Sequence, residues 1–276
     1  MSIKHYIKKR IDSTDKIFSA HKRKLLIIFI LIFSFLILSF LQQTQVLPQK
    51  SISILQDIDI PQKNDKVIFV IPHADDETLA SGGLIQRAIK NQADVYIILV
   101  TDSNHRGLKN KRYLEFFNVI NNYKINDKKV FLLNLPDGKL SIIGRDVIEK
   151  DLINIFFGIR PNYIIYPSVF DHHIDHKIIG EVVLNIINRQ TNIKSYSYLV
   201  HYKYYPRPMK YSKNSYLMPP LALISFNWEW QKFILTTSEE NLKCKLIYSY
   251  KTQLNYPILK ELLPAFCRRN ELYIKY

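Results

Sequence analysis

Apolar runs of strand length alternate with segments of helical periodicity from residue 66 onward, and this alternation restricts the fold more than any other feature. Strands are expected at residues 66–71, 94–101, 129–135, 162–168 and 194–201, and helices at 78–90, 110–123, 145–159 and 174–190. The apolar runs are continuous, as in strands that helices cover on both faces. The sequence therefore predicts an α/β domain with a mainly parallel sheet and helices on both faces.

Two of the expected loops stand out by their side chains. PHADDE (72–77) follows the first strand, SVFDHHIDH (168–176) follows the fourth, and together they hold four of the eight histidines. In parallel sheets, ligand sites lie at the carboxyl ends of the strands, where both loops are expected. Crowded carboxylates repel one another unless a cation neutralises them, and imidazole with carboxylate is a ligand set that suits Zn²⁺. We therefore predict a metal site between the two loops.

The spacing within the loops indicates a ligand set. His73 and Asp76 are three positions apart, so both can face one ion at the turn into a helix. His176 from the other loop could complete a set of three, leaving a fourth position for water as in catalytic zinc sites. A metal held in this way lowers the pKa of its water toward ~7 and prepares a nucleophile.

Three further side chains fit the roles that a reaction with metal-activated water requires. Asp75 is adjacent to a predicted ligand but points elsewhere, which suits a general base. His173 could stabilise an oxyanion or protonate the leaving group, with Asp175 orienting its ring. A purely structural alternative is also open, because acids are favoured at helix N-termini and Glu77 fits such a cap. The coincidence of two clusters at strand ends favours the metal.

PHADDE followed about a hundred residues later by HIDH resembles the LmbE-like (PIG-L) family of zinc-dependent N-acetylglucosaminyl deacetylases. The resemblance covers roughly residues 66–276. It implies a Rossmann-like fold and hydrolysis of an N-acetyl amide on an amino sugar or glycoconjugate. His73, Asp76 and His176 match the family's zinc ligands, with another divalent metal such as Fe²⁺ as the alternative to Zn²⁺.

The resemblance also assigns roles to residues that are not ligands. Asp75 matches the general base, His173 the histidine that stabilises the tetrahedral intermediate, and Asp175 its partner. Arg112 in RYLE resembles an arginine that contacts substrate. The turn LPDG (135–138) resembles a family turn, which we interpret as structural.

Two departures from the family pattern leave the substrate open. Ile174 replaces the usual proline of H-P-D-H, which changes the stiffness of the loop but not its chemistry. Asp171 stands where some relatives carry a tyrosine that helps the oxyanion.

Residues 25–41 form a run of seventeen residues without a charged side chain. A helix needs ~17–25 residues of this kind to cross a bilayer. A cleaved signal peptide is the main alternative, but no small-x-small cleavage site follows the run. We therefore predict an uncleaved transmembrane signal anchor, with the lipid bilayer as a partner.

Basic residues at 22–24 lie directly before this run, and the next basic residue after it is Lys50. The positive-inside rule then keeps residues 1–24 in the cytoplasm and the catalytic domain on the extracytoplasmic side. We expect residues 42–64 to form a stalk and residues 65–276 to form the catalytic domain.

The formal net charge of +15 suits an anionic membrane surface or an anionic substrate. Nucleic acid is not expected as a partner, because no nucleic-acid-binding motif accompanies the charge. Cys244 and Cys267 form no C-x-x-C pair, and they could pair with each other or remain buried thiols.

Two other functions compete with the deacetylase. DHHIDH is close to the H-x-H-x-D-H motif of metallo-β-lactamase-like hydrolases, but that motif needs a histidine at position 171, and another metal-dependent amidase is a related alternative. A non-catalytic glycan-binding module on the same fold is the third hypothesis, and an intact base at Asp75 argues against it.

Overall fold

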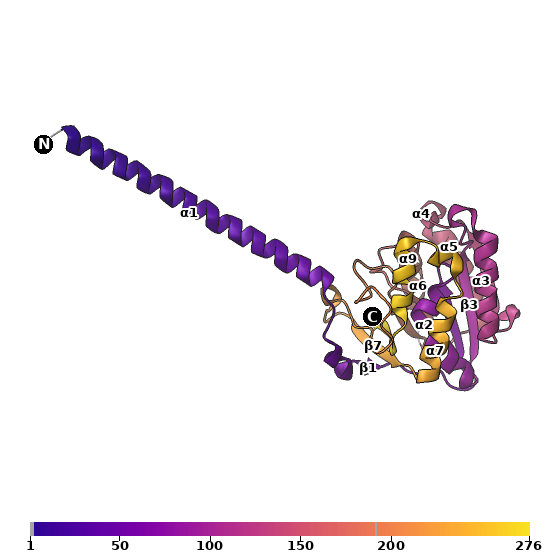
Figure 1. Ribbon diagram of the computed structural model, residues 1–276. Coiled ribbons are helices and arrows are strands. Elements are labelled where there is room, and N and C mark those ends of the chain that lie inside the picture. Colours follow the sequence, from indigo (N-terminus) through magenta and orange to yellow (C-terminus); the bar gives the residue numbers. More distant parts are fainter. Residues whose placement is uncertain (1–2, 191) are drawn as a thin grey trace. The chain divides into compact units, whose positions relative to one another are not determined.

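The chain divides into two units, residues 1–45 and residues 46–276. The structure is a computed structural model that describes residues 3–190 and 192–276. The first unit is a single long helix, α1 (Ile3–Thr44), shown in indigo in Figure 1. The apolar run at 25–41 lies within it, and the large hydrophobic side chains of that run are exposed.

The second unit is built on an eight-stranded sheet with the order β1-β7-β8-β6-β5-β2-β3-β4. Its strands are β1 (Gln56–Asp57), β2 (Lys66–Ile71), β3 (Asp94–Thr101), β4 (Val130–Leu135), β5 (Tyr163–Pro167), β6 (Lys194–Tyr198), β7 (Glu229–Ile234) and β8 (Asn270–Lys275). All neighbours are parallel except the two pairs that β8 makes, with β6 and with β7. The predicted mainly parallel α/β fold is confirmed.

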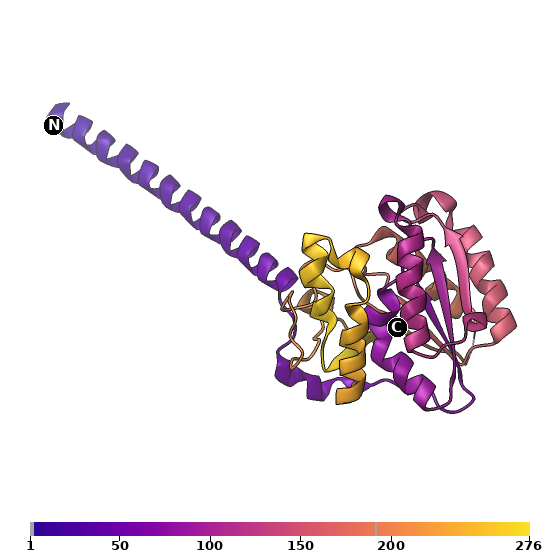
Figure 2. The same cartoon turned by 45° about the vertical axis from the view of Figure 1, so that its right-hand side comes forward.

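Helices lie on both sides of this sheet (Figure 1 and Figure 2). They are α2 (Asp76–Lys90), α3 (Lys109–Asn122), α4 (Leu140–Ile143), α5 (Arg145–Ile159), α6 (Ile174–Ile187), α7 (Thr237–Ile247), α8 (Lys251–Leu254) and α9 (Pro257–Leu262). Short 3₁₀ helices occur at Gln49–Ile54, His105–Gly107, Asp127–Lys129, Leu221–Leu223 and Pro264–Phe266.

The central strands are buried on both faces, which explains why their sequences are continuously apolar. On β2, Val67, Phe69 and Ile71 join the core beneath α2, α3 and α7. Ile68 and Val70 point the other way, into the core beneath α5 and α6. The alternation follows from the two-residue period of a strand.

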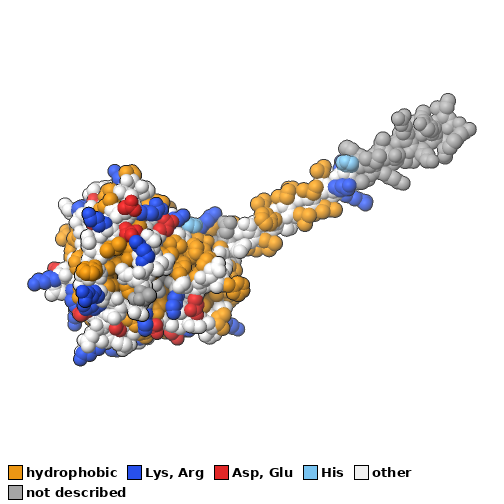
Figure 3. All heavy atoms as spheres, turned by 180° about the vertical axis from the view of Figure 1, so that it is seen from behind, with side chains coloured by type: hydrophobic (Ala, Val, Ile, Leu, Met, Phe, Trp, Pro, Cys, Tyr) orange, Lys and Arg blue, Asp and Glu red, His pale blue; other side chains and the backbone are white. Residues whose placement is uncertain are grey.

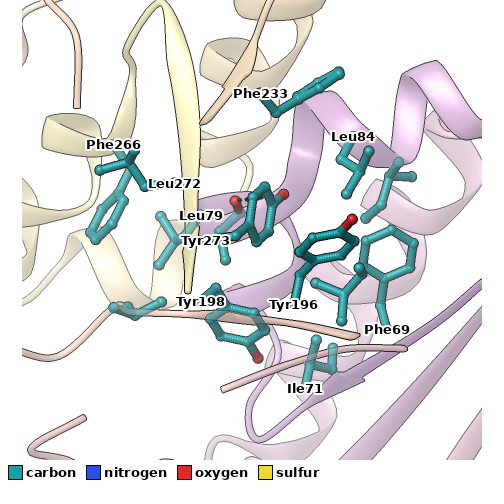
Figure 4. Packing of buried hydrophobic residues seen from close by; sticks show 14 of the residues in the cluster. Phe69, Ile71, Leu79, Leu84, Tyr196, Tyr198, Phe233, Phe266, Leu272 and Tyr273 are labelled. Carbon is teal, nitrogen blue, oxygen red and sulfur yellow. Dashed lines mark hydrogen bonds between the residues drawn. The ribbon is translucent and has the colours of Figure 1, made fainter. Parts of the chain in front are cut away.

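Aromatic rings from the C-terminal strands extend the first core. Figure 4 shows Tyr196 of β6 next to Phe69 of β2, with Tyr273 of β8 on the other side of Tyr196, and the two tyrosine ring centroids are 6.2 Å apart. The WEWQKF segment also contributes to this core, because it forms most of β7 and buries Trp230 and Phe233.

Helix α2 is broken near its middle, and the carboxylate of Glu271 in β8 accepts the backbone N–H groups that follow the break. Ser81 has non-helical angles (φ −138°, ψ 17°). The backbone N–H groups of Gly83 and Leu84 donate to the two oxygens of Glu271, at 2.7 and 2.9 Å. Lys243 of α7 pairs with the same carboxylate at 2.7 Å, so the buried charge is neutralised.

The domain boundary differs from the sequence prediction. Part of the segment that was expected to be a stalk packs against the domain, because β1 pairs with β7 and both Leu55 and Ile58 enter the core. The Val46 backbone also bridges to Pro220. The second unit therefore starts at residue 46, whereas the predicted domain started at 65.

The two cysteines are free thiols, and both are buried. Cys244 lies in α7 and Cys267 directly follows the last 3₁₀ helix. A contact with Cys267 lowers the pKa of the Cys244 thiol.

Two helix glycines provide a matched test of how tightly helices pack on the sheet. A Cβ at Gly180 would lie 2.5 Å from the Pro167 carbonyl oxygen, whereas a Cβ at Gly158 meets nothing within 4 Å. We expect Gly180→Ala to lower the free energy of unfolding by about 1–3 kcal/mol through overpacking. Gly158→Ala should raise it by up to about 1 kcal/mol through helix propensity. Urea unfolding measures both, and equal stability of the two variants would contradict the packing described for α6.

Candidate active site

Parallel pairing of β2 with β5 brings the two motif loops together. The strands are direct neighbours, and both loops leave the same edge of the sheet. His73 lies in the loop between β2 and α2, and Asp76 is the first residue of α2. His176 lies in the first turn of α6. All three side chains are buried.

Three ligand atoms from these residues form a small triangle. His73 Nδ1 is 3.3 Å from His176 Nε2 and 3.5 Å from Asp76 Oδ2, and the third side measures 3.1 Å. In a tetrahedral site with zinc bonds of about 2.0–2.1 Å, neighbouring ligand atoms are about 3.3 Å apart. Asp76 Oδ1 is buried without a hydrogen-bond partner among the described residues. The three residues therefore fit a tetrahedral divalent ion.

Carboxylates support the remaining nitrogens of both imidazoles. His73 Nε2 lies 3.2 Å from Asp175 Oδ2 and 3.2 Å from Asp137 Oδ1. His176 Nδ1 lies 3.2 Å from Asp171 Oδ2. Burial lowers the pKa of His176, but Asp76 and Asp171 outweigh burial and raise it to about 9. Such carboxylates fix the orientation of metal-binding histidines and make them stronger ligands.

Asp171 links the two loops on either side of the site. Its Oδ1 accepts the His173 backbone N–H at 2.9 Å. Its Oδ2 accepts the backbone N–H groups of Val200 and His201, at 3.1 and 3.0 Å. No role of its own was predicted for this aspartate, yet it supports His176 and fixes the loop after β6.

Asp75 lies beside the ligand triangle without belonging to it. Its φ of 134° is in a region that residues other than glycine rarely adopt, and such strain is concentrated at functional sites. Burial raises the pKa of Asp75 to about 8, against the opposing effect of Arg112. Arg112 Nη2 lies 3.7 Å from the Asp75 carboxylate and donates to the Ala74 carbonyl at 2.9 Å.

Glu77 was predicted to cap the N-terminus of the helix. Its side chain accepts the Asp75 backbone N–H, directly before α2, at 3.2 Å. It is also fully buried and accepts hydrogen bonds from the Tyr250 and Thr78 hydroxyls. The third acid of the cluster therefore holds the loop in place and does not face the triangle.

The His173 ring is fixed by backbone, whereas the sequence predicted that the Asp175 carboxylate would orient it. His173 precedes α6, and its Nδ1 accepts the Asp175 backbone N–H at 3.3 Å. The Asp175 carboxylate turns instead to His73 and to the N–H groups of Gly138 and Leu140. Burial and the neighbouring histidines lower the pKa of His173 to about 4. A neutral ring that accepts at Nδ1 carries its proton on Nε2.

Two further residues in the site, besides Asp171, had no predicted role. Asp137, in the LPDG turn after β4, contacts His73 and lies 3.5 Å from Arg112 Nη1. His201, after β6, has its ring centroid 4.6 Å from that of His176. Both follow strands of the sheet, so their position at the carboxyl edge is the signal that could have identified them.

A cavity of about 190 Å³ opens onto these side chains. It is lined by Asp75, Arg112, Asp137, His73 and His173, with apolar side chains from α9 and the residue that follows it. The arrangement combines a site for a divalent ion, a free carboxylate and an imidazole donor around one small space.

The family model described as PIG-L, GlcNAc-PI de-N-acetylase, matches residues 68–187. That span contains both motif loops and all three members of the triangle. The resemblance seen in the two motifs is confirmed, because this span of the chain matches the PIG-L family model. A search of curated proteins finds no match.

Solved structures with different activities share the fold. N,N'-diacetylchitobiose deacetylase from Pyrococcus horikoshii aligns with a TM-score of 0.52 at 20% identity, over 73% of this chain and 75% of that one. The A40926 pseudoaglycone deacetylase Dbv21 gives 0.58 at 14%, over 78% and 97%. The 4-carboxy-2-hydroxymuconate hydratase GalB from Pseudomonas putida gives 0.52 at 13%, over 73% and 82%. At these identities the similarity establishes the fold.

Removal of one supporting carboxylate should weaken metal binding. We expect Asp171→Asn to lower the affinity for Zn²⁺ by about 10–100-fold, because a neutral amide polarises the His176 ring less. Competition with a chelator of known affinity measures this, and thermal unfolding without metal tests the fold. Asp127→Asn, at an exposed position, is the control. Equal affinities in the two variants would contradict the role assigned to Asp171.

Proposed function

We propose that this protein is a membrane-anchored, metal-dependent deacetylase that removes the acetyl group from an N-acetylated amino sugar. The observation that carries the proposal is the triangle of His73, Asp76 and His176, with the free carboxylate of Asp75 next to it. The PIG-L match over both loops supports the same class of enzyme. Two proteins with this fold are deacetylases, and one of them acts on N,N'-diacetylchitobiose.

The three triangle residues would hold Zn²⁺, with Fe²⁺ as the alternative ion. When bound, the ion supplies Lewis acidity toward the acetyl carbonyl and lowers the pKa of water. Asp75 takes the proton of the attacking water as general base. The oxygen of that water adds to the acetyl carbon, the carbon–nitrogen bond breaks, and the nitrogen gains a proton. The products are acetate and a free amino sugar.

His173 is assigned to the oxyanion that forms on the acetyl oxygen. Its neutral ring presents an Nε2–H donor, because Nδ1 is occupied by the Asp175 amide. A donor that is already fixed in place stabilises developing charge without reorganisation. Asp175 contributes through this amide and through its carboxylate beneath His73, so its role is to position both rings.

Arg112 is proposed to contact the substrate. It is buried beside Asp75 and lines the cavity. Its Nη1 and Nη2 lie beside Asp137 and Asp75, two carboxylates that line the same cavity. The same guanidinium contacts the carboxylates of both Asp75 and Asp137, so its positive charge reduces the repulsion between them.

The metallo-β-lactamase-like alternative gains no support from the site. Its motif requires a ligand at position 171, but Asp171 lies behind His176 and accepts three backbone N–H groups. The glycan-binding alternative would not require the strained, buried carboxylate at Asp75.

Acetate release should depend on both the base and the metal. We expect Asp75→Asn to lower the rate by about 10²–10⁴-fold while the bound metal is retained. Asp76→Asn should lose metal and activity together. The full chain in detergent, loaded with Zn²⁺, is assayed with N,N'-diacetylchitobiose and longer N-acetylglucosamine glycans. Full activity of Asp75→Asn, or activity that persists after complete chelation, would refute the proposed mechanism.

The N-terminal helix is proposed to anchor the protein in a membrane. The stretch His21–Gln42 is long and apolar enough to span a bilayer, although a signal sequence would have the same properties. Apolar side chains cover this stretch in Figure 3, with the basic residues at its N-terminal end. The positive-inside rule then places residues 1–24 in the cytoplasm and the deacetylase domain on the extracytoplasmic side.

Charges within the apolar run should abolish anchoring. Each arginine near the centre of a span costs about 2.5–3.5 kcal/mol on insertion scales. We therefore expect the double variant Ile32→Arg, Phe33→Arg to leave membranes on a carbonate wash, whereas the unmodified chain stays. Leu114→Arg, at an exposed position of the domain, is the control. Retention of the double variant in washed membranes would contradict the anchor.

A further inference from the structure

The chain that connects the N-terminal apolar run to the domain is short. The run ends at Leu41, and the second unit begins at Val46. Fully extended, the chain from Leu41 to Val46 spans at most ~18 Å. The Gln45 backbone N–H donates to the Leu41 carbonyl at 2.9 Å, so the chain is helical here and rises only about 8 Å over this stretch. Chain length alone therefore keeps Val46 close to the end of the apolar run.

A bilayer that holds the apolar run leaves little space between itself and Val46. The headgroup layer on each side of the hydrocarbon core is about 5–8 Å thick. With Leu41 at the edge of the hydrocarbon core, a helical rise of about 8 Å brings Val46 to the outer limit of the headgroups. The part of the domain that surrounds Val46 would then lie at the lipid surface.

Residues 46–49 are fixed to the domain and do not form a flexible spacer. The Val46 backbone forms a β-bridge with Pro220. The Gln49 side-chain amide donates to the Tyr216 carbonyl at 2.8 Å and accepts the Tyr216 backbone N–H at 2.6 Å. The part of the domain nearest to the anchor is therefore built by residues 46–54 and 216–228, which we call the entry surface.

Three large apolar side chains of the entry surface are exposed. Phe226 is fully exposed, Ile54 is 76% exposed and Ile224 is 47% exposed. Phe226 and Ile224 lie in a loop whose ends are held together, because the Trp228 indole N–H donates to the Leu223 carbonyl at 2.9 Å. Apolar side chains in water are unfavourable in proportion to their exposed area, and contact with lipid removes that cost.

The chain in and next to the entry surface carries positive charge only. Residues 42–56 and 210–228 contain three lysines, at positions 50, 210 and 213, and no acid. Anionic lipid headgroups attract lysines that lie within a Debye length of the bilayer. The charge therefore favours the same contact as the apolar side chains.

We propose that the entry surface lies against the bilayer, with Phe226 and Ile224 inserted into the layer of lipid headgroups. The inference rests on the proposed membrane anchor and goes beyond it, because a transmembrane helix by itself requires no contact between the domain and lipid. It gives the domain one fixed side toward the membrane and leaves the other sides in water.

The test places a fluorescent label on the entry surface of the full chain in vesicles of phosphatidylcholine and phosphatidylglycerol. Phe226→Cys is labelled with an environment-sensitive NBD group, and the lipids carry a nitroxide quencher either at the headgroup or at the end of the acyl chain. We expect the headgroup nitroxide to remove most of the fluorescence and the acyl-end nitroxide to remove little. The reason is that interfacial side chains enter a bilayer by only about 5–10 Å.

Leu114→Cys with the same label is the matched control. Leu114 is an apolar residue that is 74% exposed, but it lies in α3, between β3 and β4 in the chain. In the sheet, β4 is the strand farthest from β1. Neither nitroxide should quench this label. The unmodified chain treated with the same reagent gives the background, because both native cysteines are buried.

Two results would overturn the contact with lipid. Equal quenching at positions 226 and 114 would mean that the label itself enters the bilayer. Blue-shifted emission at position 226 that no lipid nitroxide quenches would mean that a second copy of the chain covers the entry surface.

A carbonate wash of the same vesicles separates this inference from the proposed anchor. If the chain stays in washed vesicles but neither nitroxide quenches the label at position 226, the contact is refuted and the anchor stands. If the wash removes the chain, although the headgroup nitroxide quenched the label at position 226 beforehand, the contact is supported and the anchor is refuted.

Discussion

The buried carboxylate of Glu271 joins three parts of the domain that are far apart in the sequence. It accepts the N–H groups that the break in α2 leaves without helical partners, and it pairs with Lys243 of α7. A buried charge that loses its partners typically costs 3–5 kcal/mol. Because Asp75 and Asp76 lie at the start of α2, the position of this helix determines where the catalytic carboxylate and one ligand lie. The geometry of the site therefore depends on a strand that contributes no ligand to it.

The acids of the two loops share one region but occupy different electrostatic environments. Burial raises the pKa of Asp75, whereas at Asp76 the effects of His176 and His73 together outweigh burial and lower the pKa. Burial also opposes ionisation of Asp137, but His73 and Arg112 lower its pKa to about 2. Acids with such different proton affinities can take different roles in one reaction. Asp76 and Asp137, whose pKa values are lowered, lie against imidazoles. Asp75, whose pKa is raised, lines the cavity beside the ligand triangle.

The sequence predicted the parallel part of the sheet well, because β2, β3 and β5 are buried on both faces and their sequences are apolar throughout. Strand β8 was missed for a physical reason. Asn270 and Glu271 are buried polar residues within it, and their partners lie in other elements. The residues of PHADDE and HIDH could be identified from the sequence, because each motif is a short contiguous stretch. Asp171, Asp137 and His201 were not assigned roles, because their contacts are formed only when loops from separate strands meet. The orientation of Asp175 could not be predicted either, since it depends on the N–H groups of Gly138 and Leu140.

The place of β8 in the sheet has a consequence for how the domain assembles. Strands β1 and β7 are connected to the rest of the sheet only through β8, which pairs with β7 on one side and β6 on the other. Domains begin to fold while the chain is still being synthesised from its N-terminal end. Five parallel strands, β2 to β6, can pair with one another before β8 has been synthesised. Strands β1 and β7 can join that sheet only after β8 is present. The hydrogen bonds from the break in α2 to Glu271 also require β8. The site would therefore reach its final geometry at the last step of assembly.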